Sequence, residues 1–147
     1  MDIYSDIIVK HSKNPKNYLG NRGISGKQWQ TTVGRFPACS ENLILHSHVE
    51  DEKFIDLKWT GTGSIIMVAS ASICTDHVCG MTFEETLAWA DKVFEYFSKI
   101  KDYKKDELGE LVGLEQVKNY PRRVRSAILP VHTIKLTIAK IRAQYGR

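Results

Sequence analysis

The first apolar residues of the chain recur at helical spacing. Positions 3, 4, 7 and 8 carry Ile, Tyr, Ile and Ile. They fall on one stripe of a helix with about 3.6 residues per turn, which predicts a helix over residues 3 to 12. Pro15 sets its end, because the residue before a proline avoids the helical backbone conformation. Glycines at positions 20, 23 and 26 then predict a loop.

Alternating polar and apolar side chains follow, a pattern typical of half-buried strands. Three such runs span residues 29–36, 43–49 and 53–60. In the second run the odd positions share one face, formed by Leu43, Leu45, Ser47 and Val49. In the third run the pattern places Phe54 opposite a face shared by Ile55, Leu57 and Trp59. A polar turn at 50–52 joins these two runs, so we predict an antiparallel hairpin extended to three strands.

After position 63 the pattern becomes helical again. Residues 64–79 are rich in small and apolar side chains and end at Gly80, which predicts a mostly buried helix. Thr82 and Glu85 have the spacing of a capping box, which predicts the start of a second helix. A short helix is expected at 107–117 and a long one at 121–144, with a break or a fresh helix start at Pro130. This order predicts an α+β fold, a three-stranded antiparallel sheet with helices packed on one face.

Composition places the chain among ordinary globular proteins, since 42% of its residues are apolar and 26% are charged. Its 147 residues suit a single domain over 1–147, large enough to need neither disulfides nor metal for its core. Three cysteines, an odd number, argue against a disulfide framework. No run of about 18 apolar residues exists, and the first residues lack signal-peptide features. We therefore expect a cytoplasmic protein.

Four separated blocks of the sequence carry motifs: residues 4–17 with a Lys-Asn-Pro turn, 36–41 (Phe-Pro-Ala-Cys-Ser-Glu), 61–64 (Gly-Thr-Gly-Ser) and 120–127 (Tyr-Pro-Arg-Arg-Val-Arg-Ser-Ala). Together they resemble one family, the IscU/NifU-like iron–sulfur cluster assembly scaffolds, and within it the SufU branch. Residues 4–17 resemble the opening helix and turn of this family, and 36–41 resemble its Asn-Pro-x-Cys-Gly-Asp loop. Residues 61–64 (Gly-Thr-Gly-Ser) resemble Gly-x-Gly-Cys, and 120–127 resemble Phe-Pro-x-Arg-x-Lys-Cys-Ala. Residues 103–117 resemble the SufU-type insertion. The blocks keep the order and spacing of the family over nearly the whole chain.

The resemblance also implies a metal site. In this family three cysteines and one aspartate bind zinc or an iron–sulfur cluster. Carried over by position, Cys39 is the first cysteine and Glu41 takes the place of the aspartate, whereas Ser64 and Ser126 replace the other two cysteines. A serine hydroxyl does not ionise near neutral pH, so these two positions have lost their ligands. We expect Cys39 and Glu41 to bind metal weakly, and neither zinc nor a cluster to be held tightly.

An arginine next to this set offers a different use of the pocket. Arg125 precedes Ser126, in a basic cluster with Arg122 and Arg123. Because a buried carboxylate without a counter-charge is costly, we hypothesise that Arg125 pairs with Glu41 where the family has its metal. The alternatives are a solvated basic start of the last helix and a docking patch for an acidic partner.

The resemblance implies a role in iron–sulfur cluster assembly, as a scaffold or as an acceptor of sulfur from a cysteine desulfurase. Cys39 is the only family thiol left to accept sulfur, so the chain is at most a sulfur-accepting partner and not an enzyme in its own right. The alternative is a non-catalytic, metal-free relative that binds or regulates the assembly machinery. Both interpretations require a protein partner. Nucleic-acid binding is not expected, because the net charge of +4 is modest and no groove-reading motif is present.

Two further groups of residues have spacings found in metal sites. Cys74, His77 and Cys79 lie on the predicted buried helix, where we interpret Cys74 as an apolar core residue. His46 and His48 lie on one face of a strand, where exposed polar alternation explains them equally well. His11 and His132 are expected to be surface or capping residues.

Overall fold

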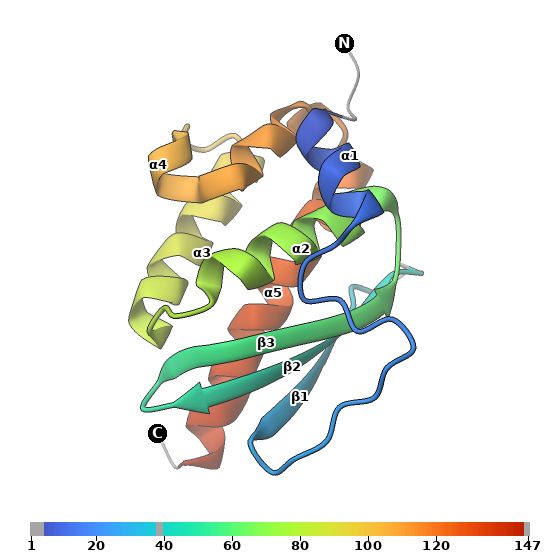
Figure 1. Ribbon diagram of the computed structural model, residues 1–147. Coiled ribbons are helices and arrows are strands. Elements are labelled where there is room, and N and C mark those ends of the chain that lie inside the picture. Colours follow the sequence, from blue (N-terminus) through green and yellow to red (C-terminus); the bar gives the residue numbers. More distant parts are fainter. Residues whose placement is uncertain (1–4, 38–39, 146–147) are drawn as a thin grey trace.

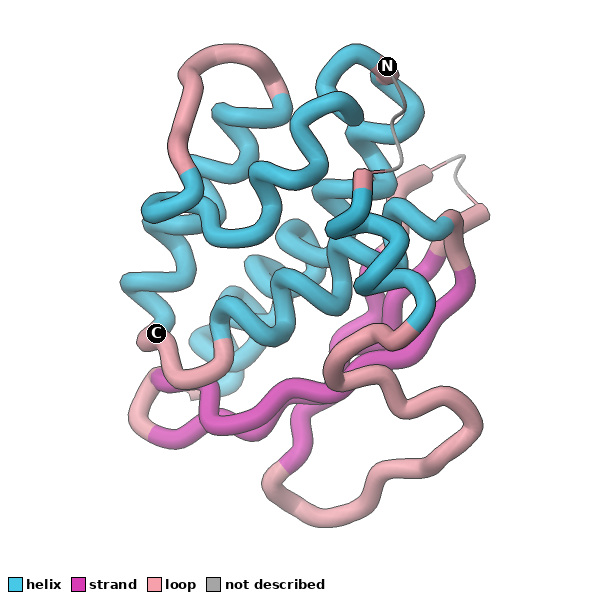
Figure 2. Tube along the Cα trace, turned by 45° about the horizontal axis from the view of Figure 1, so that its top comes forward, coloured by secondary structure: helices cyan, strands magenta, loops and turns pink. Residues whose placement is uncertain are grey.

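The computed structural model describes residues 5–37 and 40–145. Its three strands, β1 (Trp29–Gly34), β2 (Asn42–Glu50) and β3 (Lys53–Thr62), form one antiparallel sheet in the order β1-β2-β3. The helices are α1 (Asp6–Lys13), α2 (Ile65–Val78), α3 (Phe83–Phe97), α4 (Lys105–Leu108), the 3-10 helix η1 (Gly109–Asn119) and α5 (Pro121–Gln144). Figure 1 shows α5 passing behind the strands, and Figure 2 shows the helices gathered on one side of the sheet. The predicted fold class is confirmed.

The turn between β2 and β3 is a two-residue turn. Glu50 pairs with Lys53, which leaves only Asp51 and Glu52 in the connection. Both residues adopt left-handed backbone conformations, with φ of 51° and 55°. Hairpin turns of this kind match the twist of the flanking strands, so the short acidic stretch sets the register of the hairpin.

A bulge in β3 changes which of its residues reach the core. His48 pairs with Asp56 and Val49 pairs with Phe54, so Ile55 is an extra residue opposite this step of β2. Because one inserted residue inverts the alternation, Phe54 is fully buried while Ile55 is 41% exposed. The strict alternation predicted for this strand was therefore wrong at these two residues.

The core lies between the sheet and the helices. Leu45 on β2 pairs with Thr32 on β1 and with Trp59 on β3, and all three side chains are buried beneath the helical layer. Helix α5 packs closely against β1. A Cβ atom at Gly34 would lie 1.8 Å from Thr133 Oγ1, so this close approach requires glycine. The Thr137 hydroxyl also donates a 2.8 Å hydrogen bond to Thr32 Oγ1.

Local capping signals give the helices their starting points. Ser64 caps α2 and accepts a 3.3 Å hydrogen bond from the Met67 N–H. Thr82 and Glu85 form the predicted capping box of α3, with reciprocal bonds of 2.9 and 3.1 Å. Each cap satisfies backbone N–H groups that have no partner within the helix. The predicted start of α3 at Thr82 is confirmed.

Two helix predictions in the second half of the chain were wrong. The expected helix at 107–117 is instead the short α4 followed by η1, and Gly109 with φ of 70° separates them. The expected break at Pro130 is absent, because α5 runs without interruption from Pro121 to Gln144. An internal proline costs about 3 kcal/mol in a helix. The buried neighbours Leu129 and Val131 pack into the core on both sides of it, which holds the two halves in line.

His11 is buried in the structure, contrary to the surface or capping role predicted for it. Only 1% of it is exposed, and its Nδ1 lies 2.6 Å from Ser72 Oγ. Its Nε2 lies 3.3 Å from Glu110 Oε2, and Ser72 Oγ also accepts a 2.7 Å bond from the Lys16 N–H. This network ties α1 to both α2 and η1.

Among residues 5–37 and 40–145, no helix has both the length and the apolar character needed to cross a membrane.

Candidate functional site

Three residues that the family resemblance assigns to metal positions meet at one end of the sheet. Glu41 directly precedes β2, Ser64 follows β3 as the N-cap of α2, and Ser126 lies in the second turn of α5. Glu41 is 9% exposed and Ser126 is 4% exposed, so the carboxylate and this hydroxyl are both largely withdrawn from solvent. The fold therefore brings together three positions that are far apart in the sequence.

The Glu41 carboxylate bridges the two serine positions. Its Oε1 accepts a 2.7 Å hydrogen bond from the Ser126 hydroxyl, and its Oε2 accepts a 2.7 Å bond from the Ser64 backbone N–H. Ser64 lies at the N-terminal end of α2, where the helix dipole favours negative charge. The carboxylate thus has two short donors and a favourable dipole, which offset part of its loss of hydration.

Gly63 makes room for this arrangement. A Cβ atom at this position would lie 2.9 Å from Glu41 Oε2 and 2.5 Å from Met67 Cε. Any side chain here would push either the carboxylate or the methionine out of place. The second glycine of the Gly-Thr-Gly-Ser block therefore leaves room for the Glu41 carboxylate and the Met67 side chain.

Cys39, the candidate sulfur acceptor and weak metal ligand, lies outside the described residues. The next residue, Ser40, is exposed and lines the same pocket as Glu41, Ser64 and Ser126. The role predicted for Cys39 therefore stays a prediction from sequence.

The pocket above these residues has a volume of about 690 Å³. The described residues that line it are all polar, charged or glycine: Ser40, Glu41, Thr62, Gly63, Ser64, Arg122, Arg123, Arg125 and Ser126. Arg125 thus lines the pocket as expected. Among the described residues, however, no ion pair within 4.0 Å joins it to Glu41. Ser126 and the Ser64 N–H hold the carboxylate at short range, and a counter-charge role for Arg125 stays a prediction.

The donor atoms do not fit a zinc or iron–sulfur site. A structural zinc site has four strong donors, most often thiolates and imidazoles. Ser64 and Ser126 offer only hydroxyls, and both oxygens of Glu41 already accept hydrogen bonds. Within the part of the chain that the structure describes, no three His, Cys, Asp or Glu side chains gather closely enough to hold a metal ion. Even with Cys39 added, the pocket has at most two ionisable donors.

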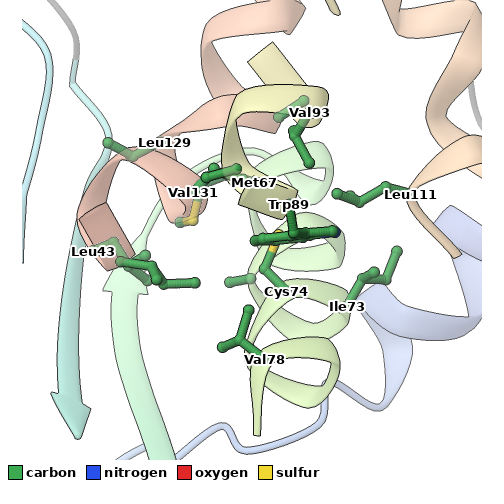
Figure 3. Packing of buried hydrophobic residues seen from close by; sticks show 14 of the residues in the cluster. Leu43, Met67, Ile73, Cys74, Val78, Trp89, Val93, Leu111, Leu129 and Val131 are labelled. Carbon is green, nitrogen blue, oxygen red and sulfur yellow. The ribbon is translucent and has the colours of Figure 1, made fainter. Parts of the chain in front are cut away.

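Cys74, His77 and Cys79, the sulfur-containing group on and after α2, do not form a metal site in the structure. Cys74 is fully buried in the core, as Figure 3 shows, and burial raises the pKa of its thiol to about 12. The His77 ring stacks on Trp89 with 5.0 Å between ring centroids. Cys79 is exposed and lies 3.4 Å from the Ile55 carbonyl oxygen, to which its S–H donates. The interpretation of Cys74 as a core residue is confirmed.

The strand histidines have separate local partners. A ring nitrogen of His46, Nδ1, lies 2.9 Å from Thr31 Oγ1 on the neighbouring strand. His48 Nε2 lies 2.9 Å from Glu50 Oε2 on its own strand. The His132 ring is half-buried and lies 4.9 Å from the Phe36 ring. These contacts explain the histidines without a metal ion.

The sequence did not predict the two hydrogen bonds that hold the Glu41 carboxylate. The capping role of Ser64 had a local signal, because a serine directly before a helical run is a preferred N-cap. The bond from Ser126 had no such signal, since 85 residues separate it from Glu41. Arg122 and Arg123 were treated as a surface cluster, but they share the pocket with Glu41.

Comparisons with known proteins agree on one family. The family described as "NifU-like N terminal domain" matches residues 3–127. The iron–sulfur cluster assembly scaffold protein IscU of Thermotoga maritima is 30% identical over 142 residues, covering 95% of this chain and 94% of that protein. The zinc-dependent sulfurtransferase SufU of Bacillus subtilis is 27% identical over 139 residues, covering 94% and 90%. The crystal structure of FiSufU from Fervidobacterium islandicum AW-1 superimposes with a TM-score of 0.76 at 26% identity, over 91% of this chain and 95% of FiSufU.

Proposed function

Because this chain belongs to the NifU-like N-terminal domain family, we propose that it takes part in iron–sulfur cluster assembly without holding a cluster or zinc of its own. Relatives named as scaffolds and as a zinc-dependent sulfurtransferase support the first half of this proposal. The second half is supported by the hydrogen bonds that Ser126 and the Ser64 N–H donate to Glu41, since they occupy both oxygens of the carboxylate. We place its action in the cytoplasm, as one domain that works with another protein of the assembly machinery.

The loss of tight metal binding follows from the donor chemistry. Binding of zinc to a complete thiolate-rich site is worth about 10–16 kcal/mol in small peptides. A site with two of its three thiols replaced by hydroxyls loses the donors that supply most of this free energy. A metal entering the pocket would also have to displace the two short hydrogen bonds to Glu41. The pocket therefore keeps its shape by hydrogen bonding.

Sulfur acceptance at Cys39 is the activity that survives this loss. A thiolate attacks the terminal sulfur of the desulfurase persulfide, the S–S bond breaks, and the desulfurase cysteine leaves as a thiolate. This transfer needs one reactive thiol on the acceptor and no metal as a reactant. Cys74 is excluded because it is fully buried.

Incubation with a cysteine desulfurase and free cysteine tests the proposal. We expect mass spectrometry to find an added sulfur atom on Cys39, and Cys39→Ser to abolish it. The exposed Cys79 supplies the matched control, since Cys79→Ser should leave the adduct unchanged.

A metal-free binding or regulatory partner is the alternative, and the intact, hydrogen-bonded pocket favours it over loss of all function. In that case no adduct forms, but the chain binds the desulfurase and changes its rate of sulfide release. If the experiments find no adduct and no binding to the desulfurase, a role in assembly is contradicted.

A further inference from the structure

The pocket above Glu41 has a composition unlike that of an ordinary ligand cavity. Small-molecule sites are mostly lined by apolar and aromatic side chains, with a few polar groups that orient the ligand. Of the described residues that line this pocket, none carries an apolar side chain. Its volume of about 690 Å³ lies within the range of small-molecule sites, about 300–1,000 Å³. Its polarity therefore selects a highly polar ligand.

Positive charge dominates the lining. Arg122, Arg123 and Arg125 contribute three guanidinium groups against the single carboxylate of Glu41, which gives a net charge of +2 (3 − 1). Among the described residues, none of these arginines makes an ion pair within 4.0 Å. By contrast, Arg142 pairs with Glu52 at 3.0 Å, and Arg22 donates to the backbone carbonyls of Tyr18 and Leu19. The three pocket arginines thus keep their hydrogen-bond donors available.

The negative charge of Glu41 is directed into the protein. Its two oxygens accept bonds from Ser126 and from the Ser64 N–H, which form the inner wall of the pocket. The arginines, Ser40 and Thr62 are exposed and form the outer part. An anion in the outer part would therefore meet guanidinium and hydroxyl donors, while the carboxylate is held on the inner wall by its own donors.

The N-terminal end of helix α5 adds to the preference of the pocket for an anion. Helix α5 begins at Pro121 with no side-chain cap on its first turn, and Arg122 lies in that turn. The positive end of this 24-residue helix therefore adjoins the pocket. The charge, the donors and the helix end all favour the same kind of ligand.

We propose that this pocket is a binding site for a small phosphate-bearing anion, held by Arg122, Arg123 and Arg125. Guanidinium groups bind phosphate oxygens through paired, charge-assisted hydrogen bonds, and a phosphate has enough oxygens to accept from three arginines at once. A lone carboxylate has only two oxygens and would leave donors unmatched. Binding of phosphate by these arginines needs neither a sulfur atom nor a metal ion as a reactant, so this proposal goes beyond the assembly role proposed above.

Titration of the full chain with sodium phosphate, followed by proton–nitrogen NMR, tests this proposal. Sodium chloride keeps the ionic strength constant. We expect saturable shifts of the Ser64, Arg122 and Ser126 amides. Arg125→Gln should weaken phosphate binding about tenfold, since it removes charge-assisted hydrogen bonds. Lys53→Gln is the matched control, because it removes the same charge at the opposite end of β3, about 30 Å away, and should change the affinity less than about twofold.

A second arm identifies the source of the phosphate group. Tighter binding of glycerol phosphate than of inorganic phosphate indicates an organic phosphate ligand, and equal binding indicates free phosphate. Shifts that sodium chloride reproduces, or equal weakening by Lys53→Gln and Arg125→Gln, would overturn the proposal. A third outcome would also overturn it: a poly-glutamate peptide shifts these amides and phosphate does not. That result would assign the arginines to an acidic protein partner.

Discussion

Ser126 Oγ donates a 2.7 Å hydrogen bond to Glu41 Oε1. Both residues occupy positions that the family resemblance assigns to metal ligands, and both are largely buried. The bond closes the pocket from α5 to the start of β2, where a metal ion would otherwise join the same two elements. The proposal that the pocket is held together without a metal ion therefore depends on this contact.

Removal of the Ser126 hydroxyl is expected to destabilise the protein. Ser126→Ala deprives Glu41 Oε1 of its short donor and should lower the free energy of unfolding by about 1–3 kcal/mol. Urea unfolding followed by circular dichroism measures the change. Ser40→Ala is the matched control, because Ser40 is exposed at the rim of the same pocket and its loss should change stability by less than about 0.5 kcal/mol. Equal effects of the two substitutions would show that the bond contributes little.

The buried network around His11 predicts a second stability effect. Ser72 Oγ joins His11 Nδ1 at 2.6 Å and the Lys16 N–H at 2.7 Å. Ser72→Ala leaves the buried His11 ring and the partly buried Lys16 N–H without this partner, so we expect a loss of about 1–3 kcal/mol in the same unfolding experiment. Ser12→Ala on α1 provides the comparison, because its hydroxyl donates to the Val9 carbonyl in an exposed hydrogen bond. A Ser72→Ala protein as stable as Ser12→Ala would mean that the network does not anchor α1.

The two described cysteines should differ sharply in reactivity. Cys74 is fully buried and its thiol pKa is raised to about 12, so it reacts only when the protein unfolds. Cys79 is exposed, although burial and then the carboxylates of Asp56 and Asp76 raise its pKa as well. With iodoacetamide at pH ~8, native Cys74 should be protected at least about a hundredfold relative to the unfolded chain. Rapid native labelling of Cys74, measured by peptide mass spectrometry, would contradict the buried placement.

Acid should weaken the fold through its half-buried histidines. Desolvation lowers the pKa values of His46, His77 and His132 below 6.5. In the window between the lowered pKa values and 6.5, the unfolded chain binds more protons than the folded one, so stability is full above this window and falls as the pH falls through it. The thermal midpoint should therefore decrease from pH ~7.5 to pH ~5.5.

A substitution at His77 separates its contribution from that of the other histidines. His77→Phe keeps a ring that can stack on Trp89 but cannot be protonated. We expect its thermal midpoint to fall less with acid than that of the unmodified protein. An identical pH dependence in the two proteins would exclude His77 as a source of the acid sensitivity.

The sequence predicts features whose cause is local. Thr82 and Glu85 are three residues apart, so the capping box is visible in the sequence, and the same holds for the Asp51–Glu52 turn. Contacts across the fold are not visible in this way. The bond between Ser126 and Glu41 spans 85 residues, and the burial of His11 depends on α2 and η1 packing around it.

Local rules also failed where packing overrides them. The extra residue Ile55 in β3 has no sequence signal, because bulged and regular strands share the same composition. Pro130 predicts a break in an isolated helix, but core contacts on both sides keep α5 continuous. At the candidate site the resemblance pointed to Glu41, Ser64 and Ser126, which the structure brings together. The hydrogen bonds of Glu41 and the arginine-lined pocket required the folded structure.

Metal analysis of two proteins shows whether the pocket of the unmodified chain binds zinc or iron tightly. The unmodified chain and a Ser64→Cys/Ser126→Cys variant are purified without chelators, incubated with equimolar zinc, desalted and measured by plasma mass spectrometry. We predict far less than one zinc per chain in the unmodified protein and close to one in the variant, whose restored thiols complete the donor set. Near-stoichiometric zinc or iron in the unmodified chain that disappears in Cys39→Ser would contradict the account.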